Sequence, residues 1–222
     1  MSVNSKIYIV IPAWNEAQNI AAVLANLAQY DYQVVVVNDG SVDETAQEVK
    51  KFANVYLLSH LINRGMGAAL QTGNEFALQQ GAEVIVHFDA DGQMQAKDIE
   101  SMILPIFSGE VDITMGSRHM GMKSNLPWLK RYIIQPPAKV INFLFTGMNL
   151  TDVHNGFRAL NRKAAATIEI KQDGMAHATE ILQHVSKYDL RYQEIPVEII
   201  YTDFGQGIMG GFKILRDLII KK

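Results

Sequence analysis

Short β-rich runs alternate with helical patterns through the first half of the chain. The runs cover residues 7–11, 33–37, 55–58, 84–88 and 111–115. Between them, apolar residues recur every three or four positions, which predicts helices that end near Leu27, Phe52, Leu78 and Phe107. Strands that alternate with helices predict an α/β fold with a mostly parallel central sheet flanked by helices.

Local residues mark where the first elements begin and end. We expect Pro12 to stop the first strand, since proline lacks the N–H that a strand donates. We expect Asn15 to cap the helix that follows, and Ser41 or Asp43 to cap the next one.

The second half of the chain is less regular. It predicts a strand that ends at Leu160, a helix at 176–187 and a strand at 190–201 with Pro196 at an edge or bulge. Further helical patterns cover 127–149 and 212–222. No repeat or linker interrupts the chain, so we expect one domain over residues 1–222.

Polar residues gather where four of the predicted strands end, at 14–16, 38–41, 89–91 and 116–118. Ligands bind beyond the carboxyl ends of strands in parallel sheets, so this rim is the expected site. Asp89 and Asp91 stand two positions apart at a strand end, and their carboxylates therefore point the same way. Such a pair suits a hard cation, Mg²⁺ or Mn²⁺, although aspartates are also common in strand-end turns.

Composition narrows the function classes. The 222 residues carry a net charge of −3, which argues against a nucleic-acid partner. The absence of cysteine excludes disulfides, thiolate metal sites and a cysteine nucleophile. The first residues lack the apolar core of a secretory signal, and no apolar run is long enough to span a membrane. We therefore expect a cytoplasmic protein.

The order of the polar motifs is similar to that of family 2 glycosyltransferases, in particular the polyprenyl-phosphate mannose and glucose synthases. The resemblance runs from about Ile7 to Tyr201. It rests on six stretches in the family's order, at 9–16, 37–45, 63–69, 89–93, 116–118 and 152–159.

The resemblance implies a GT-A fold, with a Rossmann-like nucleotide-binding half at 1–118 and an acceptor-binding half at 119–222. It implies metal-dependent transfer of a hexose, with inversion, from a GDP- or UDP-sugar to a polyprenyl phosphate. Residues of the nucleotide pocket would be Pro12, Trp14, Glu16 and Asp39, with Arg64 near the donor. Trp14 packing on the sheet and a solvated Arg64 are the plainer alternatives.

By the same resemblance, Asp89, Asp91 and Gln93 form the metal and diphosphate site. Asp91 is the expected direct ligand, while Asp89 holds either the metal, the sugar or a metal-bound water. Gln93 adds a neutral oxygen that is compatible with Mg²⁺ or Mn²⁺.

The resemblance also assigns residues to the acceptor. Arg118 and Arg131 would hold its phosphate, because guanidinium suits bidentate phosphate binding. Arg158 would contact phosphate or brace its loop. Asp152 is a candidate base, and Glu180 is either a base or structural. The acceptor-side residues are therefore Arg118, Arg131, Asp152, Arg158 and Glu180.

Beyond Glu194 to Val197 the chain departs from the dolichyl-phosphate enzymes, because residues 201–207 lack their arginine and lysine. This ending is closer to bacterial polysaccharide glycosyltransferases. Two acceptors stay open. A phosphate monoester is already a nucleophile at neutral pH, whereas a sugar hydroxyl needs a positioned base. A nucleotide-sugar-binding module without turnover is a further alternative, and a sugar-nucleotide pyrophosphorylase is disfavoured because no Gly-rich basic loop follows the first strand.

Two segments combine apolar faces with basic residues, at 140–145 and 212–222. Such helices can lie on the inner face of the cell membrane as peripheral anchors. Ordinary core packing and the surface of a homodimer are equal alternatives.

Overall fold

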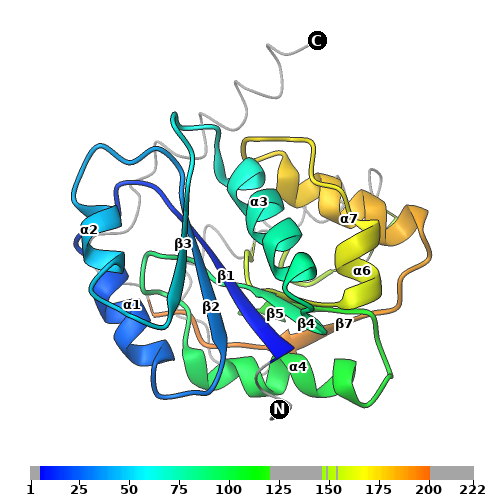
Figure 1. The fold of residues 1–222 in the computed structure, drawn as a ribbon. Coiled ribbons are helices and arrows are strands. Elements are labelled where there is room, and N and C mark those ends of the chain that lie inside the picture. Colours follow the sequence, from blue (N-terminus) through cyan, green and yellow to red (C-terminus); the bar gives the residue numbers. More distant parts are fainter. Residues whose placement is uncertain (1–5, 121–146, 149, 154, 201–222) are drawn as a thin grey trace, which may run out of the picture.

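The computed structural model describes residues 6–120, 147–148, 150–153 and 155–200. Within them, the strands form a seven-stranded sheet in the order β3-β2-β1-β4-β6-β5-β7 (Figure 1). The strands are β1 (Ile7–Ala13), β2 (Gln33–Asn38), β3 (Val55–Ser59), β4 (Val84–His87), β5 (Ile113–Ser117), β6 (Arg158–Asn161) and β7 (Tyr192–Pro196).

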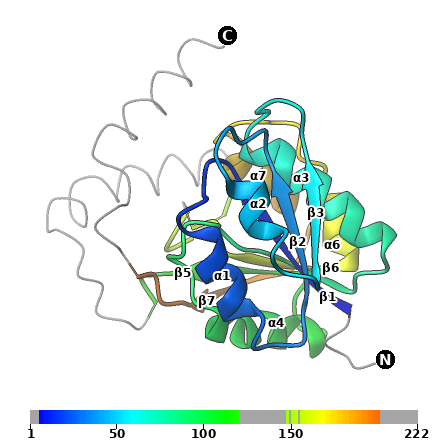
Figure 2. The same ribbon diagram turned by 60° about the vertical axis from the view of Figure 1, so that its left-hand side comes forward.

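Helices cover both faces of this sheet (Figures 1 and 2). One face packs against α1 (Ile20–Leu27), α2 (Thr45–Val49) and α4 (Ile99–Phe107), which follows a 3-10 turn, η2 (Ala96–Asp98). The other face packs against α3 (Met66–Gln79), α6 (Arg162–Thr167) and α7 (His177–Lys187). Alternate residues of the central strands enter the two cores, so these strands read as continuous apolar runs.

The sheet is mostly parallel, as predicted, with β6 as the exception. β6 runs antiparallel to both of its neighbours, and Arg158 at its start pairs with His87 of β4 and Met115 of β5. The residues that precede β6 therefore arrive at the rim where β4 and β5 end. This arrangement adds the segment before Arg158 to the four polar clusters predicted there.

The prediction that Pro12 stops the first strand is wrong. β1 continues through Pro12 to Ala13, in register with Val37 and Asn38 of β2. The carbonyl of Val10 accepts the N–H of Phe88 on the β4 side, and Pro12 faces the same side two residues later. β4 has already ended there, so the missing N–H costs no ladder hydrogen bond.

The prediction that Asn15 caps the first helix is also wrong. α1 begins at Ile20, and Asn15 has a positive φ of 57° in the preceding loop. Neither Ser41 nor Asp43 occupies the N-cap position of α2, which is Glu44, although the Asp43 carboxylate accepts the N–H of Thr45, the first residue of that helix.

Three further differences concern the later elements. α6 was not predicted, because its six residues are too few to show a helical period. The helix predicted to end near Phe107 is divided into η2 and α4, and the last predicted strand is shorter, with Pro196 at its end on the edge of the sheet. The helices expected at 127–149 and 212–222 fall almost wholly outside the described residues. Among the described residues, no helix is long and apolar enough to cross a bilayer.

Candidate active site

The loops after β1 and β2 are joined to each other by side-chain hydrogen bonds. The Asn15 N–H donates to Ser41 Oγ at 2.9 Å, and the Val42 N–H donates to Asn15 Oδ1 at 3.0 Å. The Ala17 N–H donates to Asp43 Oδ2 at 3.1 Å. The Asn15 side chain thus connects two loops instead of capping a helix, and both loops are fixed on the rim.

Asp39 fixes a third loop beside them. Its buried carboxylate accepts the backbone N–H of Arg64 at 2.9 Å and of Gly65 at 2.7 Å. His60 Nδ1 lies 2.6 Å from Asp39 Oδ1, and His60 Nε2 lies 2.9 Å from Thr72 Oγ1. Asp39 therefore positions the loop that carries Arg64 at the start of α3.

The residues predicted for the nucleotide pocket share this part of the rim. Pro12 is buried at the end of β1, and Trp14 is 55% exposed. Arg64 is exposed, whereas Glu16 is half-buried. Burial raises the pKa of Glu16, and the nearby charge of Asp91 raises it further. Glu16, a residue predicted for the nucleotide pocket, is therefore close enough to Asp91 for their charges to interact.

Asp89 and Asp91 follow β4, as predicted, and share a turn in which Gly92 has a φ of +76°. Asp91 Oδ1 accepts the N–H of Gln93 at 3.0 Å. Burial and the charge of Asp91 raise the pKa of Asp89 to about 7, and burial raises the pKa of Asp91. Negative charge is therefore concentrated at this point of the rim.

This turn suits a divalent cation. The donor atoms it offers are oxygens, from two carboxylates and the Gln93 amide, which are the ligands that Mg²⁺ and Mn²⁺ prefer. A cation would also offset the charge of Asp91, which together with burial raises the pKa of Asp89. Among the described residues, no three acidic or histidine side chains are grouped closely enough to hold an ion. Oxygens of a bound diphosphate or water would have to complete its coordination.

The segment before β6 presses against Asp89. Asn155 Oδ1 accepts the N–H of Phe157 at 3.0 Å, which folds a tight turn around Gly156. A Cβ on Gly156 would lie 3.1 Å from Asp89 Oδ2 and 3.2 Å from Oδ1. The Phe157 ring packs edge-on against Phe88 at 5.5 Å. Only glycine lets this turn approach the carboxylate so closely.

Arg158 lies below this turn and not on its surface. It is 2% exposed, and its Nη1 has no hydrogen-bond partner among the described residues. Burial lowers its pKa to about 10, while the charges of Asp89 and Asp152 oppose that shift. Arg158 therefore lies beneath the turn within reach of the charges of Asp89 and Asp152, and both of its expected roles stay predictions.

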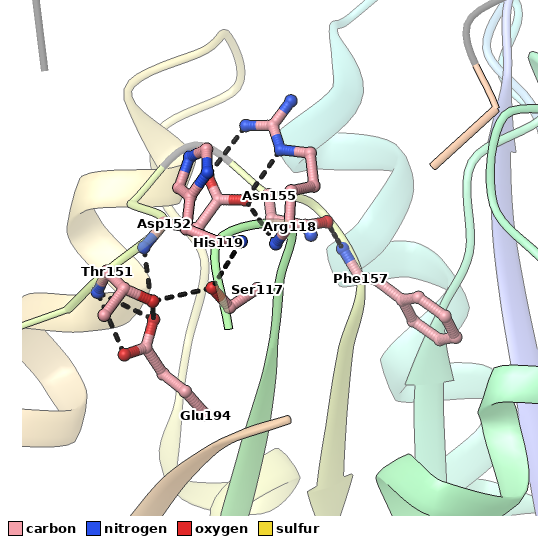
Figure 3. Close-up of polar contacts among 8 residues, drawn as sticks. All are labelled: Ser117, Arg118, His119, Thr151, Asp152, Asn155, Phe157 and Glu194. Atoms are coloured by element: carbon pink, nitrogen blue, oxygen red, sulfur yellow. Dashed lines mark hydrogen bonds and ion pairs between the residues drawn. The ribbon is translucent and has the colours of Figure 1, made fainter. Parts of the chain in front are cut away.

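Arg118 and Asp152 form a bidentate pair at the end of β5 (Figure 3). Arg118 Nε donates to Asp152 Oδ2 at 2.6 Å and Arg118 Nη2 to Oδ1 at 2.7 Å. The backbone N–H of Arg118 adds a bond of 3.0 Å to Oδ2. Asp152 is buried, but the bonds and charge of Arg118 outweigh burial and lower its pKa. The Arg118 side chain remains 27% exposed at the rim.

The remaining acceptor-side residues lie apart from this pair. Glu180 Oε2 accepts the N–H groups of Lys171 and Gln172, both at 2.9 Å, so it braces the loop before α7. This geometry favours the structural role that was one of its two alternatives. Arg131 lies outside the described residues.

Sequence reasoning missed Glu194, which contacts the turn that carries Asp152. Its carboxylate accepts the N–H of Thr151 at 2.8 Å and of Asp152 at 3.1 Å (Figure 3). An acidic residue among the apolar positions of a predicted strand was the available signal. The partners could not be named, because they lie more than 40 residues earlier in the chain.

Comparison with known proteins finds a matching family and similar proteins. The sequence model of Glycosyl transferase family 2 matches residues 8–168. The chain is 32% identical over 241 residues to a UDP-N-acetylglucosamine–dolichyl-phosphate N-acetylglucosaminyltransferase from Methanococcus voltae, covering 97% of this chain and 96% of that protein. It is 24% identical to a polyprenol monophosphomannose synthase from Mycolicibacterium smegmatis, covering 96% and 84% of the two chains.

A solved structure shares the fold. Glucosyl-3-phosphoglycerate synthase from Mycobacterium tuberculosis, crystallised with Mn²⁺, UDP and phosphoglyceric acid, superposes with a TM-score of 0.71 at 15% identity. The match covers 97% of this chain and 76% of that one. At this identity the similarity establishes the GT-A arrangement of the sheet and helices, as expected from the sequence.

Proposed function

Since this chain belongs to glycosyl transferase family 2 and is a glycosyltransferase, we propose that it transfers a hexose to a polyprenyl phosphate, with inversion. The donor in this proposal is a nucleoside-diphosphate sugar. Two relatives that align with nearly the whole chain are named for dolichyl phosphate and for the synthesis of polyprenol monophosphomannose.

One observation carries the choice of acceptor. Both carboxylates considered as bases are already used as hydrogen-bond acceptors, Asp152 by Arg118 and Glu180 by the Lys171 and Gln172 backbone. A carboxylate whose pKa is lowered by an arginine is also a poor proton acceptor. A sugar hydroxyl would need such a base. A phosphate has a second pKa of about 6 and attacks without one.

The donor would lie across the rim from β1 to β4. In this proposal Pro12, Trp14 and Asp39 line the nucleotide pocket, and Arg64 lies near the diphosphate. Asp89, Asp91 and Gln93 would hold Mg²⁺ or Mn²⁺. When bound, that cation neutralises charge on the diphosphate leaving group. UDP is favoured over GDP, because the Methanococcus voltae relative is named for a UDP-sugar and structural neighbours were crystallised with UDP.

Arg118 would orient the acceptor phosphate. Its guanidinium is held in one orientation by Asp152, and part of the side chain is exposed at the rim. An arginine fixed by a carboxylate on one edge can bind an anion on another edge without a further loss of side-chain entropy.

Acceptor competition tests the proposal. UDP release is measured with Mn²⁺ and UDP-hexose, in the presence of a polyprenyl phosphate, the corresponding polyprenol, or simple sugars. We expect release and product formation only with the phosphate. Turnover with sugar hydroxyls in its place would overturn the proposed acceptor. Binding of the donor without any turnover would support the alternative of a non-catalytic module.

We also propose that the rim touches the membrane surface, where a polyprenyl acceptor would lie. In the loop between β3 and α3, Leu61 is 101% and Ile62 is 72% exposed, and this loop projects beyond the sheet (Figure 1). Exposed aliphatic side chains beside a basic residue, here Arg64, are typical of interfacial contact.

Liposome flotation tests this contact. We expect the full chain to float with vesicles, and L61S/I62S to float less. L104S is the matched control, because Leu104 is 65% exposed on α4, away from this rim. Equal flotation of all three proteins would exclude the loop as the contact.

A further inference from the structure

Glu194 stands on β7, and among the described residues its hydrogen-bond donors all belong to the turn at 151–152. Its Oε1 accepts from the Thr151 N–H at 2.8 Å, the Thr151 hydroxyl at 2.9 Å and the Asp152 N–H at 3.1 Å. Its Oε2 lies 2.9 Å from the Thr151 nitrogen. An ionised carboxylate is acceptor-only, so it is matched to a turn that presents three donors.

A second chain of bonds connects this turn to the end of β5 (Figure 3). The Thr151 and Ser117 hydroxyl oxygens lie 2.6 Å apart, and Ser117 Oγ accepts the N–H of His119 at 3.2 Å. Thr151 has one hydroxyl proton and donates it to Glu194, so the Ser117 hydroxyl must donate to Thr151. Each hydrogen bond in the series from His119 to Glu194 therefore has a defined donor and acceptor, and each bond polarises the next.

Both chains end at the Arg118–Asp152 pair. Glu194 fixes the backbone of Asp152, whose carboxylate accepts three N–H groups of Arg118. Ser117 fixes the backbone on either side of Arg118. The base of the network is rigid, because Glu194 pairs with Met115 in the parallel β5–β7 ladder. Relaxing Glu194 would therefore free the turn and, with it, the carboxylate that aims Arg118.

We propose that Glu194 is a positioning residue that sets the orientation of Arg118 through Thr151 and Asp152. It does not touch the substrate. The acceptor-phosphate contact of Arg118 rests on the proposed function above, whereas the control of Arg118 by Glu194 rests on the hydrogen bonds alone.

Steady-state kinetics test the inference. The first variant is E194A, which removes the carboxylate that accepts three hydrogen bonds. The second is T151V, which removes only the hydroxyl between Glu194 and Ser117. We expect kcat/KM for the polyprenyl phosphate to fall at least tenfold in E194A, up to ~100-fold, since displacing a positioned group by 1 Å has effects of this size. KM for the donor should stay unchanged, and T151S should restore the loss seen in T151V.

The matched control is E198Q. Glu198 lies in the same segment, but its carboxylate contacts the exposed Lys97, so E198Q should behave as wild type. E194A and T151V could instead lower kcat/KM equally for the nucleotide sugar and for the polyprenyl phosphate, in proportion to the folded fraction. Glu194 would then be merely structural, and the proposal would be overturned.

A second readout separates this inference from the proposed function. The ¹H–¹⁵N signal of Arg118 Nε is assigned by its loss in R118K. It reports the orientation of the guanidinium and needs no acceptor substrate in the sample. We expect it to shift or broaden in E194A and T151V but not in E198Q. An unchanged signal would overturn the proposed positioning of Arg118 by Glu194. If the wild type shows no transfer to polyprenyl phosphate while the signal responds, only the proposed acceptor fails.

Discussion

Two carboxylate regions of one rim are built in opposite ways. At the end of β4, Asp89 and Asp91 lie near each other and near Glu16, and the pKa of each of the three groups is raised. At the end of β5, Asp152 is also buried, yet its pKa is lowered because Arg118 binds both of its oxygens.

The difference shows which region needs a ligand. The turn at 89–93 carries more negative charge than the neighbouring groups offset, so a cation and a diphosphate would stabilise it. The Arg118–Asp152 pair is already neutralised internally, which makes it suitable as a fixed element. Replacing a carboxylate in the two regions should therefore change stability in opposite directions.

Replacing Asp91 should have the largest effect on transfer. D91N should lower the rate by ~10³-fold, because several kcal/mol of charge stabilisation would be lost with the cation. The melting temperature without metal should stay level or rise, since a like charge beside Asp89 is removed. Rates and thermal melts measure both. D98N is the control for the loss of one carboxylate charge elsewhere in the chain, because the Asp98 carboxylate accepts the backbone N–H of Glu198. A marked fall in melting temperature for D91N would show that the pair is structural.

Replacing Asp152 should lower both activity and stability. D152N leaves Arg118 without its counter-charge. Removing one partner of a buried pair costs about 3–5 kcal/mol, and we expect about 1–3 here because Arg118 is 27% exposed. Transfer should fall roughly 10- to 100-fold through the displaced arginine. Denaturant unfolding measures the first effect. A D152N protein as stable as the wild type would remove the contrast between the two regions.

The strands and the rim could be predicted from the sequence, whereas the pair at the end of β5 could not. The apolar runs predicted five strands, because a strand covered on both faces must be apolar over its whole length. Their polar ends placed Trp14, Asp39, Asp89 and Arg118 on one rim, because parallel strands end at the same edge.

The pairings between distant segments were not accessible from the sequence. Arg118 and Asp152 are 34 residues apart in the chain, and they meet only because β6 inserts antiparallel between β4 and β5. Local spacing carries no information on that insertion. Asn15 was misjudged for a related reason, since its partner Val42 belongs to another loop.

The approach of Gly156 to Asp89 gives a finer test of the β4 region. In G156A the added Cβ would lie 3.1–3.2 Å from both carboxylate oxygens, so the carboxylate must move by a few tenths of an ångström. We expect about a tenfold loss of transfer with little change in melting temperature. G174A is the control, because a Cβ there meets nothing within 4 Å. Equal rates for both variants would mean that the exact position of Asp89 is unimportant.

A third carboxylate, far from the rim, shows what a purely structural pair does. Bonds from Arg191 lower the pKa of buried Asp112 from 3.8 to about 2. The folded state therefore favours the ionised form, and this contribution is complete above pH 4 and lost as the pH falls through about 2. D112N should cost about 1–2 kcal/mol at pH 7, allowing for the exposure of Arg191, with transfer unaffected. A stability difference that did not shrink in acid would refute this assignment.

Calorimetric titration of UDP addresses the role of the β4 turn most directly. The wild type and D89A/D91A are compared with Mn²⁺ and with EDTA, after thermal melts have shown that both are folded. Binding by the wild type should require Mn²⁺, and the double variant should bind weakly or not at all. If D89A/D91A bound UDP as tightly as the wild type in Mn²⁺, the aspartates would not be holding the cation and its diphosphate.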